Sequence, residues 1–179
     1  AGVHDTRFSV VRYVNVMGSR GSVIPFFMKL KETGELPITD PKMTRFMISL
    51  EEGVELVWHA FNNMQGGEIY VKKIPSMTIP DIASAIDEKA VQKIIGIRPG
   101  EKIHEQMIGL EDAPHTYEYD DHYKILPAIY NWSSDPNRNK GGTKVDENFI
   151  YSSEQNKEWM SVKDLQKWIT ANREKIGQI

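Results

Sequence analysis

Three arginines stand where predicted strands or turns run into loops: Arg20, Arg45 and Arg98. A guanidinium offers planar, paired N–H donors, which suit the oxygens of a phosphate or a carboxylate. Loops that follow strands are also where α/β folds bind ligands. The three arginines together therefore predict a site for a diphosphate. The alternative for each one is an ordinary surface arginine, because isolated charged side chains mostly remain in solvent.

The most specific of these patterns is Arg98-Pro99-Gly100-Glu101. Proline and glycine predict a tight turn, which would place the side chains of Arg98 and Glu101 next to each other. The carboxylate could then accept hydrogen bonds from ribose hydroxyls while the arginine holds a phosphate. The alternative is a local ion pair between the two residues, worth roughly 0–1 kcal/mol if it is exposed.

No recognisable catalytic set accompanies these arginines. The five histidines are scattered, and no pair has metal-ligand spacing on a predicted helix. Neither a Tyr-x-x-x-Lys pattern nor the G-x-G-x-x-G turn of dinucleotide-binding folds is present. The absence of cysteine excludes disulfides and cysteine–zinc sites. The residues alone predict a ligand-binding portion without a catalytic centre or a metal.

The composition and charge disfavour some classes of binding partner. The 179 residues are 40% hydrophobic and 26% charged, with a net charge of −3, which is typical of a globular protein. No basic field favours nucleic acid, and no basic run or long apolar run favours a membrane. We therefore expect a cytoplasmic protein that binds neither nucleic acid nor membrane.

The elements that must position the arginines follow an α/β pattern. Strands are predicted over 8–16, 45–48, 68–72, 91–97 and 116–125, and helices over 23–31, 49–64, 78–86, 103–108 and 161–169. The best-defined helix has Ser49 and Glu52 as a capping box and carries a single apolar stripe, the mark of a helix that packs on a core. That stripe consists of Leu50, Val54, Val57, Phe61 and Met64. A long polar loop is predicted over 130–148.

Four ordered blocks carry a family resemblance: RFSVVRYVNVMGSRGSVIPFF, LPITDPKMTRFMISLEEGVELV, GGEIYVKKIPSMTI and IIGIRPGEKIHEQMI. They resemble the C-terminal half of the inverting UDP-N-acetylglucosamine 4,6-dehydratases, members of the extended short-chain dehydrogenase/reductase superfamily. The resemblance is closest to the enzymes that begin pseudaminic acid synthesis. It implies the substrate-binding portion of an extended Rossmann-type fold, without the N-terminal dinucleotide-binding part.

The resemblance also implies a reaction. Such enzymes oxidise C4 of the sugar with bound NADP, eliminate water across C5–C6, and return hydride to C6 with inversion at C5. Their cofactor fingerprint and catalytic residues precede the first residue, Ala1, so no catalytic residue can be assigned here. We expect a segment of a longer, homo-oligomeric enzyme, inactive alone, in which NADP is bound mainly by the other part.

UDP-sugar recognition is what the resemblance assigns to this chain. The matching substrate-binding positions are Asn15, Arg45, Arg98 and Glu101, with Arg20 and Thr44 as weaker matches. Tyr13 and Val14 match positions near the nicotinamide end of the cofactor. Related sequences have glycine where this chain has Val14, and a β-branched side chain there would crowd the strand or the cofactor.

We expect one region without an internal linker: 1–21 as the end of the Rossmann sheet and a loop, 22–130 as the substrate-binding subdomain, and 131–179 as a loop and the last helix. Two other functions are compatible with these residues. One is a UDP-sugar 4-epimerase of the same superfamily, which differs mainly in residues that precede Ala1. The other is a non-enzymatic nucleotide-sugar-binding module.

Overall fold

A computed structural model of the chain describes residues 5–128 and 135–178. The chain folds as two compact units, each built from three separate stretches of sequence. The first unit comprises 1–13, 50–73 and 106–151, and the second comprises 14–49, 74–105 and 152–179. The predicted boundaries at 21 and 130 remain a prediction.

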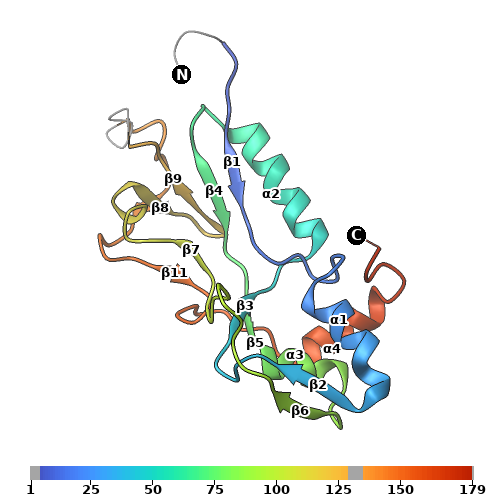
Figure 1. The fold of residues 1–179 in the computed structure, drawn as a ribbon. Coiled ribbons are helices and arrows are strands. Elements are labelled where there is room, and N and C mark those ends of the chain that lie inside the picture. The colour runs from blue at the N-terminus through green and yellow to red at the C-terminus, as the bar shows by residue number, and fades with distance from the viewer. Residues whose placement is uncertain (1–4, 129–134, 179) are drawn as a thin grey trace. The chain divides into compact units, whose positions relative to one another are not determined.

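The first unit is built on a five-stranded sheet in the order β1-β4-β9-β8-β10. The central strand β4 (Ile69–Lys72) runs parallel to β1 (Val10–Arg12) and antiparallel to β9 (His122–Ile125). The other strands of the sheet are β8 (Thr116–Glu118) and β10 (Thr143–Lys144). Helix α2 (Leu50–Asn63) lies along β1 and β4 (Figure 1).

The predicted apolar stripe of α2 is largely exposed, and another face of the helix packs on the sheet. Four of its five residues are between 39% and 62% exposed within the described part of the chain, namely Leu50, Val54, Val57 and Phe61. The helix instead buries Leu56 and Ala60 against Tyr70. The reason is that α2 is apolar around much more than one stripe, so periodicity alone does not fix which side meets the sheet.

The second unit combines two small sheets with three helices. Parallel strands β2 (Glu35–Ile38) and β6 (Val91–Ile94) form one sheet, and antiparallel β3 (Thr44–Phe46) and β5 (Ser76–Thr78) form the other. The helices are α1 (Val23–Leu30), α3 (Ile79–Ile86) and α4 (Val162–Ala171). Their apolar faces form one core with the strands, which includes Phe27, Leu36, Ile38, Ile82 and Leu165.

Side-chain caps start two of these helices, as predicted. The Thr78 hydroxyl accepts a hydrogen bond from the Asp81 amide at 3.1 Å, at the start of α3. The Ser161 hydroxyl accepts one from the Asp164 amide at 3.2 Å, at the start of α4. Such caps satisfy amides that have no partner inside the helix. The 3-10 turn Lys31–Thr33 extends α1 and ends at Gly34, which is left-handed.

Several predicted elements were wrong or too long. Residues 103–108 form no helix, because β7 (Gln106–Ile108) is a strand; the stretch 116–125 is a hairpin of β8 and β9. The first strand is shorter than 8–16, and the loop at 130–148, partly outside the described residues, contains β10. The remaining elements are the 3-10 turn Ala113–His115 and β11 (Tyr151–Ser152). The mixed α/β fold class is confirmed.

Candidate functional site

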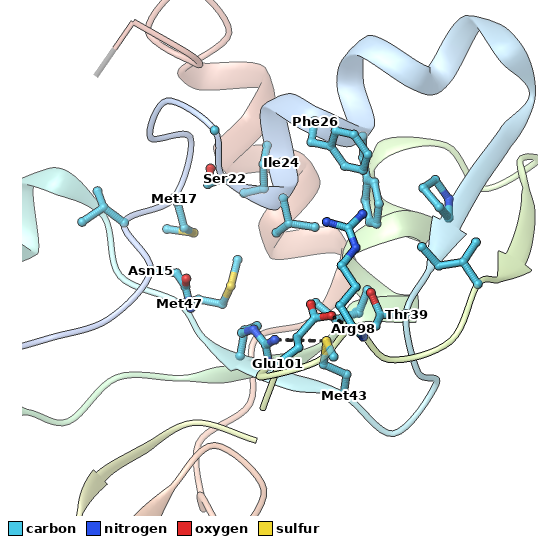
Figure 2. Close-up of a pocket in the computed structure, with 18 residues that line it drawn as sticks. Asn15, Met17, Ser22, Ile24, Phe26, Thr39, Met43, Met47, Arg98 and Glu101 are labelled. Carbon is cyan, nitrogen blue, oxygen red and sulfur yellow. Dashed lines mark hydrogen bonds between the residues drawn. The ribbon is translucent and has the colours of Figure 1, made fainter. Parts of the chain in front are cut away.

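A cavity of about 390 Å³ opens in the second unit, and four of the predicted site residues line it: Asn15, Arg45, Arg98 and Glu101 (Figure 2). Its remaining lining is mostly apolar and includes residues of α1 and β2. A concave, largely apolar wall with a few converging polar groups is the usual form of a small-molecule site. The fold therefore brings together residues that are up to 86 positions apart (101 − 15).

The predicted turn at Arg98–Glu101 is present. The Glu101 amide donates to the Arg98 carbonyl at 3.1 Å, and Gly100 has φ +82°, a conformation that favours glycine. The Glu101 carboxylate accepts from the Arg98 amide at 3.3 Å. Among the described residues, no hydrogen bond or ion pair engages the Arg98 guanidinium. Its donors therefore remain available to a ligand.

Arg45 differs sharply from Arg98. Its Nη1 donates to the carbonyls of Thr44 and Ile103, and its Nη2 donates to the Lys102 carbonyl and the Met43 sulfur. These distances lie between 2.7 and 3.1 Å. The guanidinium thus ties β3 to the segment that follows Glu101. It brings positive charge to the cavity wall but has few donors left for direct contact with an anion.

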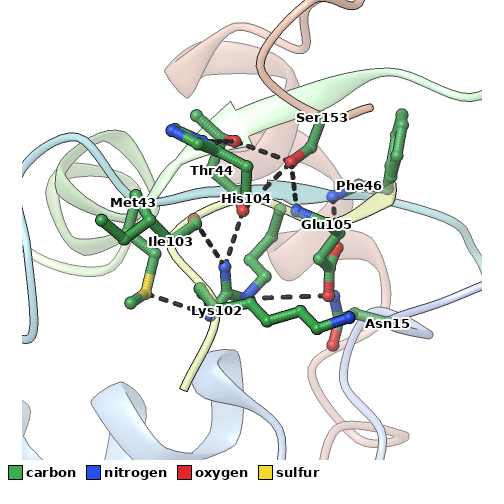
Figure 3. A network of polar contacts seen from close by, with 10 residues as sticks. Asn15, Met43, Thr44, Phe46, Lys102, Ile103, His104, Glu105 and Ser153 are labelled. Atoms are coloured by element: carbon green, nitrogen blue, oxygen red, sulfur yellow. Dashed lines mark hydrogen bonds and ion pairs between the residues drawn. The ribbon is translucent and has the colours of Figure 1, made fainter. Parts of the chain in front are cut away.

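A carboxylate that sequence analysis missed lies between Asn15 and Arg45. Glu105 Oε1 accepts a hydrogen bond from Asn15 Nδ2 at 2.6 Å and lies 3.7 Å from Arg45 Nε (Figure 3). Its Oε2 accepts from the Phe46 amide at 2.9 Å. In the sequence, Glu105 is a single glutamate in a segment predicted to be a helix, and no local pattern distinguishes it from a surface residue.

Thr44 lies behind the cavity wall. It is buried, and its hydroxyl is 2.8 Å from His104 Nδ1 and 2.7 Å from the Ser153 hydroxyl. The Ser153 hydroxyl also accepts from the Glu105 amide at 2.9 Å. This network supports the residues that line the cavity, and it draws on a part of the chain for which sequence analysis predicted no role.

Besides Thr44, three predicted site residues do not line the cavity: Arg20 and Tyr13, which are exposed, and Val14, which is half-buried. No described residue other than glycine has a positive φ, so the backbone at Val14 does not require glycine. The predicted place of Tyr13 and Val14 near the nicotinamide end of a cofactor stays a prediction. Gly18 allows close approach to Trp168 and Ile176 rather than to a ligand.

Comparison with known proteins places the chain in a family. Residues 1–127 match the family described as "Polysaccharide biosynthesis protein". A solved structure, "X-ray structure of Pen from Bacillus thuringiensis", superposes with a TM-score of 0.80 at 29% identity, covering 96% of this chain and 52% of that one. The fold and these matches are those of the extended short-chain dehydrogenase/reductase class.

The chain belongs to this polysaccharide biosynthesis family. It is 52% identical to a UDP-N-acetylglucosamine 4,6-dehydratase (inverting) of Campylobacter jejuni, over 92% of this chain and 52% of that protein. It is 43% identical to a UDP-glucose 4-epimerase of Rickettsia prowazekii, over 68% of this chain and 37% of that protein. The chain thus spans about half the length of the first of these relatives and less of the second. None of the helices in the described ranges has the length and apolarity needed to cross a bilayer.

Proposed function

We propose that this chain is the UDP-sugar-binding part of a C5-inverting UDP-N-acetylglucosamine 4,6-dehydratase. The observation that carries the proposal is the cavity in the second unit, where the unengaged guanidinium of Arg98 stands beside Glu101. Arg98 would bind a diphosphate oxygen pair, and Glu101 would accept hydrogen bonds from ribose hydroxyls. The 52% identity to the Campylobacter jejuni enzyme supports the choice of substrate.

The proposal extends to the whole enzyme. It would be a lyase that makes a UDP-4-keto-6-deoxy sugar for bacterial surface or flagellin glycans, in a pathway of the pseudaminic acid type. NADP would supply and recover the hydride, and would be held mainly by residues other than those described, with Tyr13 and Val14 near it. We further propose a cytoplasmic homo-oligomer. The chain by itself is expected not to convert UDP-N-acetylglucosamine, which chromatography of the incubated nucleotide sugar would check.

Calorimetric titration of the chain with UDP tests the site. Arg98→Ala is expected to weaken UDP binding by about 1–3 kcal/mol, which is roughly 5- to 150-fold, because a charge-assisted contact is lost. Arg45→Ala is expected to weaken UDP binding indirectly. The Arg45 guanidinium is engaged by carbonyls, and its loss frees the 102–105 segment. The contribution of the exposed Arg20 is tested by Arg20→Ala.

Arg173→Ala is the matched control, because it removes an exposed arginine that does not line the cavity. It should leave UDP affinity unchanged. Equal affinities for the wild type, Arg98→Ala and Arg173→Ala would refute the diphosphate assignment.

A UDP-sugar 4-epimerase is the second candidate, favoured by the 43% identity to the Rickettsia prowazekii enzyme. Competition between nucleotide sugars separates the two. The dehydratase proposal expects UDP-N-acetylglucosamine to bind more tightly than UDP-glucose, and the epimerase proposal expects the reverse. The third candidate is a non-enzymatic nucleotide-sugar-binding module. It would be favoured if a longer natural form of the protein showed neither dehydratase nor epimerase activity.

A further inference from the structure

We propose that Glu105 is a positioning residue that fixes the orientation of the Asn15 amide, so that Asn15 presents its carbonyl oxygen to the ligand. This assigns the Asn15 end of the cavity to the sugar, which has hydroxyl and amide N–H donors, and not to the diphosphate. The inference rests on the proposed function, because it takes the ligand to be a nucleotide sugar.

The first support is the contact between the two side chains. Glu105 Oε1 lies 2.6 Å from Asn15 Nδ2. An ionised carboxylate can only accept hydrogen bonds, so its neighbour in this contact has to be the NH₂ group of the amide. The chemistry of the pair thereby decides the orientation of Asn15: the NH₂ group engages Glu105, and Oδ1 is the one acceptor that this side chain can offer to a ligand.

The second support is that Glu105 is itself held in place. Its Oε2 accepts from the Phe46 amide at 2.9 Å, and its side chain is only 17% exposed. Its own amide donates to the Ser153 hydroxyl at 2.9 Å, and its carbonyl accepts from the Ser153 amide at 2.8 Å. A carboxylate anchored on both the main chain and the side chain cannot turn away from Asn15 without breaking several hydrogen bonds.

The consequence concerns which ligand group fits there. Asn15 lies at the side of the cavity with Met17 and Met47, whereas Arg98 lies near Thr39 (Figure 2). Phosphate oxygens are acceptors and gain nothing from an amide oxygen, but a sugar hydroxyl or an N-acetyl N–H can donate to it. Arg98 and Asn15 therefore select different parts of one ligand by opposite hydrogen-bond polarity.

Glu105→Gln is the sharpest test because it preserves the shape of the side chain and replaces one acceptor oxygen with a donor NH₂ group. The glutamine oxygen can keep the Phe46 amide, which places its NH₂ group against the NH₂ group of Asn15. The clash is relieved when the Asn15 amide rotates by half a turn, and the cavity then meets a donor instead of an acceptor. A merely structural role would lower stability without such a change in ligand preference.

The measurement is the ratio of the dissociation constants for UDP and UDP-N-acetylglucosamine, by calorimetric titration of the full chain. Glu105→Gln is expected to weaken UDP-N-acetylglucosamine about tenfold, as for one lost hydrogen bond of about 1.4 kcal/mol, and to leave UDP within about twofold. The double variant Asn15→Asp/Glu105→Gln restores an acceptor toward the ligand and a donor–acceptor pair behind it. It is expected to recover much of the wild-type ratio.

A readout without ligand separates this inference from the proposed function. In a ¹⁵N correlation spectrum, the Asn15 side-chain NH₂ resonances are those that vanish in Asn15→Asp, and Glu105→Gln should shift them strongly. Failure of the wild type to bind either nucleotide would refute the proposed function alone. An unchanged ratio in Glu105→Gln, or unshifted Asn15 resonances, would refute the role of Glu105.

Discussion

Glu68 in the first unit and Glu105 in the second are both poorly exposed carboxylates, yet they do different work. Glu68 is 2% exposed and accepts from the amides of Gln65 and Gly66 at 2.9 and 2.8 Å, and from Arg138 at 3.3 Å. Its partners close the turn before β4. Glu105 instead accepts from Asn15, whose side chain lines a cavity.

The difference shows that burial of a charged group is not by itself a functional signal. Both carboxylates satisfy the rule that a charge removed from water needs hydrogen-bond partners. Glu68 accepts its hydrogen bonds from the main chain and a neighbouring arginine, so it contributes to the stability of the fold. Glu105 accepts one of its hydrogen bonds from Asn15, which lines the cavity, and we propose that it contributes to ligand binding through this contact.

The largest expected effect that separates the two is on stability. Glu68→Ala leaves two turn amides, of which that of Gly66 is buried, without their acceptor and removes one partner of Arg138. We expect a loss of about 3 kcal/mol in the free energy of unfolding. Urea denaturation measures it, with nucleotide titration in parallel.

The matched variant is Glu105→Ala, for which we expect a loss of about 2 kcal/mol together with weaker UDP-N-acetylglucosamine binding. Glu68→Ala should leave the ratio of the UDP and UDP-N-acetylglucosamine affinities unchanged. The comparison breaks if Glu68→Ala alters that ratio while Glu105→Ala does not.

A smaller effect is expected one contact further from the cavity. Ser153→Ala removes the hydroxyl that the Glu105 amide and Thr44 share, and we expect about 1–2 kcal/mol of destabilisation. Ser152→Ala is the control, because among the described residues that hydroxyl has only one hydrogen bond, a longer one of 3.3 Å that it accepts from the Gln155 amide. Thermal denaturation ranks the two, and equal losses would argue against a special support for Glu105.

The smallest effect is expected in the pH dependence of the first unit. Burial lowers the pKa of His122 from its ordinary 6.5, against the opposing hydrogen bond to Asp121, and the ring stacks on Tyr119 at 4.6 Å. The unfolded chain therefore binds a proton more readily. Stability from this group is complete above pH 6.5 and is lost as the pH falls through the lower folded pKa.

His122→Asn should flatten this slope in urea denaturation measured at about pH 7.5 and about pH 5. The hydrogen bond to His122 likewise lowers the pKa of Asp121 from 3.8, but that contribution is lost only below pH 3.8. A slope in His122→Asn as steep as that of the wild type would assign the acid sensitivity to other groups.

Local chemistry predicted a substantial part of the fold. The capped starts of α3 and α4, the glycine end of the turn after α1, and the Arg98–Glu101 turn all depend on neighbours within a few residues. Prediction failed where the deciding partner is distant. Residues 103–108 have apolar spacing that fits a helix, but 103–105 are irregular and only 106–108 form a strand. The hairpin at 116–125 was hidden because its turn contains neither glycine nor proline.

The sequence by itself determined which groups are present and what they can do: a guanidinium at Arg98, a carboxylate at Glu101, and the turn that joins them. Only the tertiary structure decided which groups are free to act. Arg45 and Arg98 are chemically the same, yet backbone carbonyls from another segment engage one and leave the other unengaged among the described residues. Hydrogen-bond partners far apart in the chain are set by folding, and no local pattern contains them.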